Sequence, residues 1–143
     1  MKLHGNCQVA RTITKAIEGI ISKAAASTTG RGGAGGRQGI ASARDSIDIT
    51  IFRLDQSEVE QALASAVSRG VSVSALIAAT NSTGEENLRK LELRLLGSGV
   101  TVTRTADDLA RYHAKLMIVD HRILYLMAFN LTHADIDPAA ALV

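Results

Sequence analysis

The chain alternates stretches that have the period of a strand with stretches that have the period of a helix, and few folds accommodate this order. Residues 47–52 are rich in β-branched side chains and are bounded by polar residues, which predicts a strand. Residues 55–58 bring capping residues to the start of a helix that extends to about Ser68, and Gly70 is its expected C-cap. A second strand follows at residues 71–77, so this part of the chain is predicted to be a βαβ unit with parallel strands and a right-handed crossover.

The same pattern continues toward the C-terminus. A turn at residues 81–84 precedes a predicted helix at about 85–96, residues 97–99 end that helix, and residues 100–103 form a strand. A further strand opens at His113, and a neighbouring strand at residues 123–127 is joined to it by a tight connection at 120–122. The predicted class is α/β: an α-β-α sandwich with a mixed, mostly parallel sheet flanked by helices on both faces, with ligand sites at the strand ends.

The N-terminal part differs in composition. Residues 8–26 have apolar side chains at helical spacing and predict an amphipathic helix, and residues 28–37 are rich in glycine and predict a flexible loop. Three glycines in this loop fit the dinucleotide-binding pattern, but they follow a helix where that fold needs a strand. We interpret the loop as a linker; the alternative is a mobile basic flap over the substrate that uses Arg31 and Arg37.

Composition narrows the class of function. The 143 residues are 46% hydrophobic and 21% charged, which is typical of one folded domain spanning residues 1–143. Aromatic residues make up 3% and tryptophan is missing, so base-stacking platforms are not expected. The net charge of +2 and the pI near 8.9 are a mild bias that suits an anionic substrate.

Compartment and cofactors follow from what the sequence offers. Cys7 is the single cysteine, so neither an internal disulfide nor a cysteine-rich metal site is expected. The start of the sequence lacks the apolar run of a signal peptide, and no stretch has the length of a membrane span. We therefore expect a soluble, cytoplasmic protein without a transmembrane segment and without a cofactor.

Two polar residues, His113 and Lys115, come just before the apolar run 116–119. Along an extended strand His113 and Lys115 share a face, with their Cβ atoms about 7 Å apart, so one phosphate group could contact both. Asp120 lies about 17 Å beyond Lys115 if the strand stays extended, and we expect it to cap the turn that follows. His121 lacks a comparable partner in the sequence and is expected at the surface.

The spacing of His113, Lys115 and Asp120, with Asn130 ten residues further on, resembles the motif of the phospholipase D superfamily. The flanking sequence matches as well, so the resemblance covers roughly residues 40–132. In that family, one histidine attacks phosphorus to form a phosphohistidine, a second histidine protonates the leaving alcohol, and no metal is required. The resemblance implies a catalytic set of His113, Lys115 and Asp120, with Lys115 and Asn130 binding the substrate phosphate.

That mechanism uses two copies of the motif, whereas this chain has one. The resemblance therefore implies either a homodimer or a missing second half of a longer chain. The resemblance implies a phosphodiester substrate, either a phospholipid or a nucleic acid. In its small size the chain resembles the family's dimeric endonucleases, whereas the sequence around Asn130 resembles that of phospholipase D-like proteins.

Two departures support a rival function. Met127 and Ala128 stand where much of the family has Gly-Ser, and the carboxylate that usually follows the asparagine by about ten residues is missing, with Asp135 and Asp137 as the nearest acids. The alternative to a hydrolase is therefore a catalytically degenerate or truncated module that binds phosphate groups or a partner.

Overall fold

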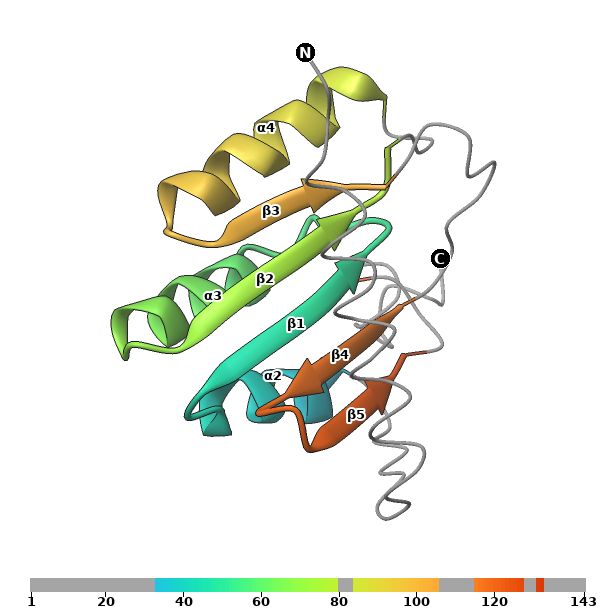
Figure 1. Cartoon of the computed structure of the whole chain (residues 1–143). Helices are drawn as coiled ribbons and strands as arrows, with labels where there is room; N and C mark the ends of the chain where they lie inside the picture. Colours follow the sequence, from blue (N-terminus) through green and yellow to red (C-terminus); the bar gives the residue numbers. More distant parts are fainter. Residues whose placement is uncertain (1–32, 80–83, 106–114, 128–130, 133–143) are drawn as a thin grey trace.

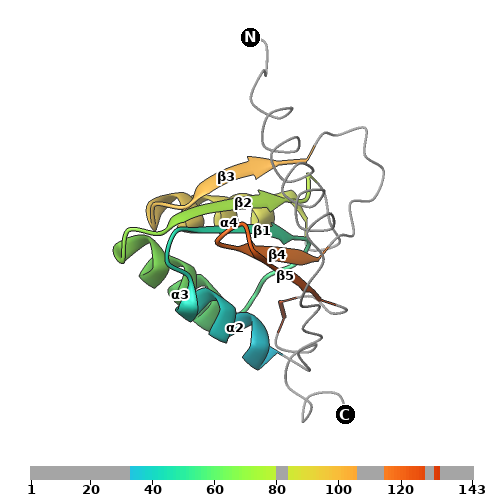
Figure 2. The ribbon, with the colours of Figure 1, turned by 60° about the horizontal axis from the view of Figure 1, so that its bottom comes forward.

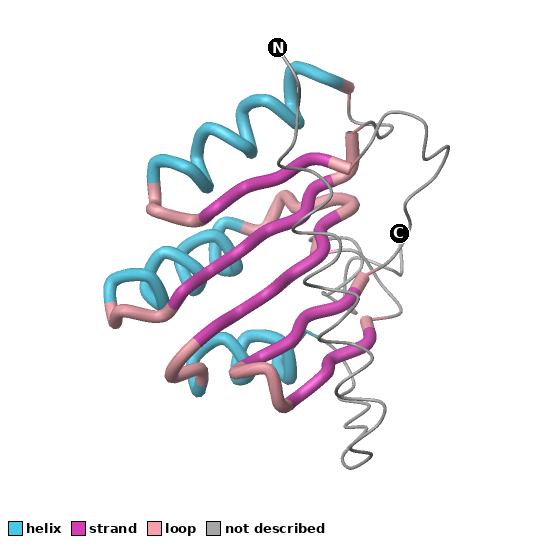
Figure 3. Tube along the Cα trace, in the orientation of Figure 1, coloured by secondary structure: helices cyan, strands magenta, loops and turns pink. Residues whose placement is uncertain are grey.

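The computed structural model describes residues 33–79, 84–105, 115–127 and 131–132 of the chain. These residues contain a mixed sheet with the strand order β3-β2-β1-β4-β5 (Figures 1 and 3). The first three strands pair in parallel, while β4 is antiparallel to both of its neighbours and so runs against the other described strands. The strands are β1 (Ser46–Ile51), β2 (Ser72–Ile77), β3 (Thr101–Arg104), β4 (Leu116–Val119) and β5 (Ile123–Leu126).

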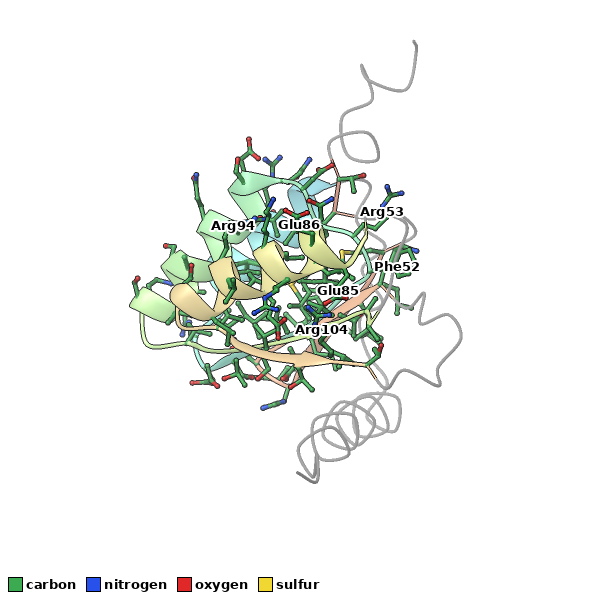
Figure 4. The ribbon with its side chains drawn as sticks, turned by 90° about the horizontal axis from the view of Figure 1, so that it is seen from above. Phe52, Arg53, Glu85, Glu86, Arg94 and Arg104 are labelled. Carbon is green, nitrogen blue, oxygen red and sulfur yellow. The ribbon has the colours of Figure 1, made fainter. Side chains whose placement is uncertain are left out.

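Three helices accompany the sheet in the described part of the chain: α2 (Gly33–Ser42), α3 (Ser57–Ser68) and α4 (Glu85–Gly97). They lie on the same face of the sheet (Figures 2 and 4). The predicted α/β class is confirmed, and so are the positions of α3, α4 and the strands. The expectation of helices on both faces does not hold for the described residues, because β1, β2 and β3 follow one another in one direction and right-handed crossovers then place α3 and α4 on one face (Figure 2). The helix predicted at residues 8–26 lies outside the described residues. None of the described helices combines the length and the hydropathy needed to cross a bilayer.

The core between sheet and helices follows the two periods found in the sequence. In β1, alternate isoleucines are turned to the helices and are at most 2% exposed. The helices contribute apolar side chains three and four positions apart, which places them on one stripe. The main contributors are Ile47, Ile49 and Ile51 of β1, Val59, Leu63 and Ala66 of α3, and Leu91 and Leu95 of α4.

Glycines end α3 and α4 as the sequence predicted. Gly70 and Gly99 have φ angles of +89° and +84°, a conformation that is strained for any other residue. The Gly70 N–H donates to the Val67 carbonyl at 2.9 Å, and the next N–H donates to the Ala66 carbonyl at 3.1 Å. This pair of bonds is the Schellman motif, and it directs the chain from the helix into the following strand.

The glycine-rich loop predicted at residues 28–37 is only partly outside the described chain, and its last residues contradict the prediction. Residues 33–37 belong to α2. Glycine disfavours a helix, so packing supplies the stability: Ile40 and Ala43 are 2% and 4% exposed against the core. A Cβ atom at Gly39 would lie 2.8 Å from the ring of Tyr125, so glycine lets β5 approach the helix.

Candidate active site

Two residues of the motif, Lys115 and Asp120, flank β4. Because β4 is antiparallel to β1, the start of β4 and the end of β1 lie at the same end of the sheet (Figure 1). Lys115 directly precedes β4, and its carbonyl accepts a hydrogen bond of 2.9 Å from the Met127 N–H across the hairpin. The backbone of Lys115 is thereby held at this end of the sheet.

The side chain of Lys115 lies over an aromatic ring. Its Nζ atom is 5.8 Å from the centroid of the Phe52 ring, and Phe52 directly follows β1. An ammonium group at this distance interacts favourably with the face of the ring, by about 0.5–1 kcal/mol where water has access. The positive charge of Lys115 is thus located beside the end of β1.

The side chain of Thr50 in β1 holds the backbone next to Lys115. The backbone pairing of β1 with β4 ends at Ile49 and Met117, and one residue further on the Thr50 hydroxyl takes over. It accepts a hydrogen bond from the Leu116 N–H at 2.9 Å and donates to the Leu116 carbonyl at 3.3 Å. Thr50 is 1% exposed, so these bonds fix the residue next to Lys115 in a setting that excludes water.

The chain that follows Asn130 also reaches the end of β1. Leu131 forms a parallel bridge with Leu54: its N–H donates to the Arg53 carbonyl, and its own carbonyl accepts from the Asp55 N–H, each at 3.2 Å. The Gln56 amide donates to the Thr132 carbonyl at 3.5 Å. The N-cap position of α3 is occupied by Gln56 without a side-chain cap, so the predicted capping role of this segment is wrong; the Gln56 side chain tethers Thr132 instead.

Two predicted site residues, His113 and Asn130, lie outside the described residues. The described chain comes within two residues of His113 at Lys115 and within one residue of Asn130 at Leu131. Both of these neighbours are held against the segment that follows β1.

Asp120 lies at the opposite end of β4. Its carboxylate accepts hydrogen bonds from the N–H groups of Arg44, Asp45 and Ser46, at distances between 2.8 and 3.2 Å. The prediction that Asp120 caps the turn following it is wrong, because its partners are the last two residues before β1 and the first residue of β1. Burial alone would raise the pKa of Asp120, but these backbone donors, with the charge of Arg44, hold it below its usual range.

The turn after β4 has an unusual backbone. Asp120 and His121 have φ angles of 53° and 50°, and the Arg122 N–H donates to the Val119 carbonyl at 3.0 Å. Two consecutive residues with positive φ are typical of the type I′ turn, whose twist matches that of a hairpin. The predicted tight connection between β4 and β5 is therefore confirmed.

One acidic residue near this turn was missed at the sequence level. Asp48 of β1 is 7% exposed, and its Oδ2 atom lacks a hydrogen-bond partner. The Nδ1 atom of His121, an exposed side chain as predicted, lies 3.7 Å from it. Burial raises the pKa of Asp48, and His121 opposes that rise. The sequence could have indicated this residue, because Asp48 is an acidic residue within a run of β-branched side chains that is predicted to be a buried strand.

The polar groups at the two ends of β4 differ in their surroundings. The Lys115 end of β4 presents a cation beside backbone that adjoins two further motif residues, a setting suited to holding a phosphate oxygen. The Asp120 end is satisfied by backbone hydrogen bonds. Among the described residues, His, Cys, Asp and Glu side chains form no group of three or more that could hold a metal ion.

Comparisons with known proteins agree with this geometry. A family model described as "Cardiolipin synthase, PLD-like domain" matches residues 37–139. The chain is similar to the crystal structure of Nuc from Salmonella typhimurium, a phospholipase D family member, with a TM-score of 0.61 and 28% identity over 68% of this chain and 63% of that one. NucT from Helicobacter pylori has the same fold, with a TM-score of 0.56 and 22% identity over 71% of this chain and 68% of that one. No curated protein sequence matches.

The match thus spans less than two thirds of the Salmonella protein.

Proposed function

Because the chain belongs to the phospholipase D-like family, we propose that it is a metal-independent phosphodiesterase that acts through a phosphohistidine intermediate. The observation that carries this proposal is the position of Lys115, whose ammonium lies at the end of β1 where the chain following Asn130 also returns. Lys115 and Asn130 hold the phosphate oxygens, and His113 is the nucleophile.

The proposed reaction has two steps. An imidazole nitrogen of His113 attacks phosphorus, the bond from phosphorus to the leaving oxygen breaks, and a histidine from a second copy of the motif protonates that oxygen. Water then attacks the phosphohistidine, gives up its proton to that second histidine, and releases the phosphomonoester and His113. The positive charge of Lys115 acts on the phosphate oxygens, where negative charge gathers in the transition state.

The experiment is hydrolysis in the presence of EDTA. Purified protein is incubated with a chromogenic phosphodiester, with DNA and with phospholipid vesicles, which also compares the two substrate classes. His113→Ala is expected to lower turnover by about 10⁴-fold or more, as the loss of a nucleophile does elsewhere. Cleavage that survives this change would show that His113 is not the nucleophile.

The second copy of the motif comes from a homodimer in this proposal, and a further half of a longer chain is the other source. Sedimentation at several protein concentrations measures the oligomeric state, and the specific activity is measured over the same range. In the dimer, activity falls on dilution together with the dimer fraction. A monomer whose specific activity does not depend on concentration contradicts the dimer.

A non-catalytic phosphate-binding module is the second candidate, because Met127 and Ala128 replace the Gly-Ser pair found in much of the family. This candidate predicts binding of anions that Lys115→Ala abolishes, without turnover of any of the three substrates. Robust EDTA-resistant turnover excludes it.

A further inference from the structure

A cavity of about 290 Å³ lies between the segment that follows β1 and the first half of α4. Its volume is near the lower end for pockets that bind small ligands, about 300–1,000 Å³. The floor is apolar and buried, formed by Leu54, Leu88 and Leu91. The rim is polar and consists of Arg53, Asp55, Asn87, Lys90, Arg94 and Thr132. We refer to this cavity as the rim pocket.

More cations than carboxylates line the rim pocket. Arg53, Lys90 and Arg94 line it, against the single carboxylate of Asp55. Figure 4 shows Arg53 beyond the start of α4, near the end of β1, and Arg94 further along the helix. Cations supplied by two separate elements around a concave surface are suited to binding an anionic group.

The cations of α4 are held by acids in ways that leave donors available. Lys90 pairs with Glu86 at 2.7 Å, but the two side chains are 60% and 82% exposed, so water competes strongly with this pair. Glu60 binds the Nε and Nη2 atoms of Arg94 at 2.8 and 3.0 Å. A guanidinium has five N–H donors, so Glu60 orients Arg94 without using all of them.

Arg104, on the other side of α4, provides a contrast (Figure 4). Its guanidinium donates to Glu85 at 2.7 Å and twice to Glu92, at 2.8 and 3.1 Å. Two carboxylates thus neutralise one cation there, and that cluster is structural. At the rim pocket, Lys90 and Arg94 each pair with one carboxylate.

Arg53 supplies an independent indication of a ligand. Its Nε atom is buried and lacks a hydrogen-bond partner. A buried donor without an acceptor is costly, and in a charged group an anion is the partner that compensates it best. Arg53 thus brings a guanidinium with a buried, unpaired Nε to the lining of the rim pocket.

The rim pocket adjoins the proposed catalytic site through the backbone. Arg53 directly follows Phe52, whose ring contacts Lys115. Thr132 lies two residues after Asn130, and the Leu54–Leu131 bridge joins the two segments. Lys115 and the rim pocket thus both adjoin the segment that follows β1.

We propose that the rim pocket binds a second phosphate group of a nucleic-acid strand whose scissile phosphodiester lies at Lys115. This inference rests on the proposed function. A strand carries a phosphate at every nucleotide and so can fill two neighbouring anion sites. Phosphatidylcholine and phosphatidylglycerol have a single phosphodiester each, and cardiolipin, which has two, is added to the vesicles of the test below as the lipid that could also fill both sites. The concave shape also favours a flexible strand over the flat surface of a bilayer.

The test measures equilibrium binding of a short fluorescein-labelled oligothymidylate by fluorescence anisotropy, in EDTA and over a range of salt concentrations. All proteins carry His113→Ala so that turnover cannot consume the probe. Lys90→Gln with Arg94→Gln is compared with Arg89→Gln plus Arg122→Gln. The two control arginines are exposed and lie outside the rim pocket, so both double variants lose the same charge.

The rim-pocket variant is expected to bind about tenfold more weakly, and its salt slope is expected to fall by about 0.7, which is the contribution of one phosphate contact to a single strand. The control is expected to remain within about twofold of its parent protein, as a general charge effect would at moderate salt. Equal weakening in both double variants would overturn the proposal, as would no weakening in either.

Two further arms make the result decisive. Vesicles of phosphatidylcholine with phosphatidylglycerol and cardiolipin replace the oligonucleotide in the same series, and a loss confined to vesicles would assign the rim pocket to a membrane surface and overturn the nucleic-acid proposal. If the loss of the Arg94–Glu60 pair prevents folding, Lys90→Gln against Arg89→Gln gives the same comparison.

The readout also separates this inference from the proposed function. Failure of the parent chain with His113 to hydrolyse any phosphodiester would overturn the enzyme assignment while leaving the binding result intact. Hydrolysis of DNA combined with no effect of the rim-pocket substitutions would overturn the second phosphate site alone.

Discussion

The two ends of β4 differ in what their polar side chains do. Asp120, at one end, is held by the backbone N–H groups of residues 44–46 at the start of β1, which lie 74 to 76 residues earlier in the sequence. Lys115, at the other end, directs its ammonium to the ring of Phe52, beside backbone that adjoins the remaining motif residues. The motif places both residues in one short pattern, but a strand separates them, so we assign Asp120 to folding and Lys115 to chemistry.

The acids near the turn show the same contrast in their protonation. Hydrogen bonds from the backbone lower the pKa of Asp120 against the effect of burial, whereas burial raises the pKa of Asp48 and only His121 opposes it. A carboxylate with backbone donors is therefore stabilised in its charged form, and one without them is destabilised.

Lys115→Ala gives the largest expected effect, and it tests the chemical end of β4. If Lys115 stabilises the charge on the phosphate, the change lowers kcat/KM for a phosphodiester by about 10²–10³-fold. The free energy of unfolding falls by no more than about 1 kcal/mol, the size of an exposed cation–π contact. Initial rates and urea unfolding measure the two quantities, and Lys115→Arg, which keeps the charge, retains part of the activity.

The proposed role of Lys115 in the chemistry is contradicted if Lys115→Ala unfolds the protein and leaves the activity of the folded fraction unchanged.

Asp120→Ala tests the structural end. Removing the acceptor of three backbone N–H groups lowers the free energy of unfolding by about 2–3 kcal/mol, since hydrogen bonds to a charged group are strong. Because the folded-state pKa of Asp120 is lowered, its stabilisation is present above the unfolded pKa and is lost as pH falls through the folded value, below about 3.8. Urea unfolding at several pH values measures both effects.

Asp120→Asn retains one carbonyl acceptor and should lose less stability. A variant that keeps its stability but loses all turnover would move Asp120 back into the chemistry.

Thr50→Val is expected to have a smaller effect, and it should lower both the stability and the activity. The isosteric change leaves the Leu116 N–H and carbonyl without their partner, which lowers the free energy of unfolding by about 1–2 kcal/mol. Because Leu116 adjoins Lys115, kcat/KM should fall several-fold as well. Thr50→Ser keeps the hydroxyl and serves as the control, and an unaltered kcat/KM in Thr50→Val would show that this support does not position Lys115.

Asp48→Asn is expected to have the smallest effect, and it has the opposite sign. The folded-state pKa of Asp48 is raised, so the wild type loses stability as pH rises from its ordinary value near 3.8 through the folded value. Asparagine does not ionise, and the variant should be more stable than the wild type at neutral pH by about 1 kcal/mol or less. Paired urea titrations at pH 3 and pH 7 check this, and lower stability at pH 7 would contradict it.

Sequence analysis predicted the elements better than their partners. The β-branched run at 47–52 predicted a strand, and the glycines at 70 and 99 predicted helix ends, because those signals act within a few residues. The helix over residues 33–42 was not predicted, since its glycines oppose a helix and its stability comes from packing against β5 and the core.

The candidate site divides in the same way. The spacing of the motif identified Lys115 and placed Asp120 too far away to share its chemistry, and the structure separates them by β4. The backbone N–H groups that bind the Asp120 carboxylate, the contact of Asp48 with His121, and the rim pocket did not emerge from the sequence.

By itself, the sequence determined the order of strands and helices from β1 onward, the tight turn after β4 and the family of the motif, because each depends on residues that are close together along the chain. The tertiary structure alone decided that the Asp120 carboxylate is hydrogen-bonded to the backbone and that the Lys115 ammonium lies over the Phe52 ring. Both contacts depend on residues 44–46 and the segment at 52–56, which reach β4 only when the sheet forms. Contacts between residues so distant in the sequence leave no local pattern.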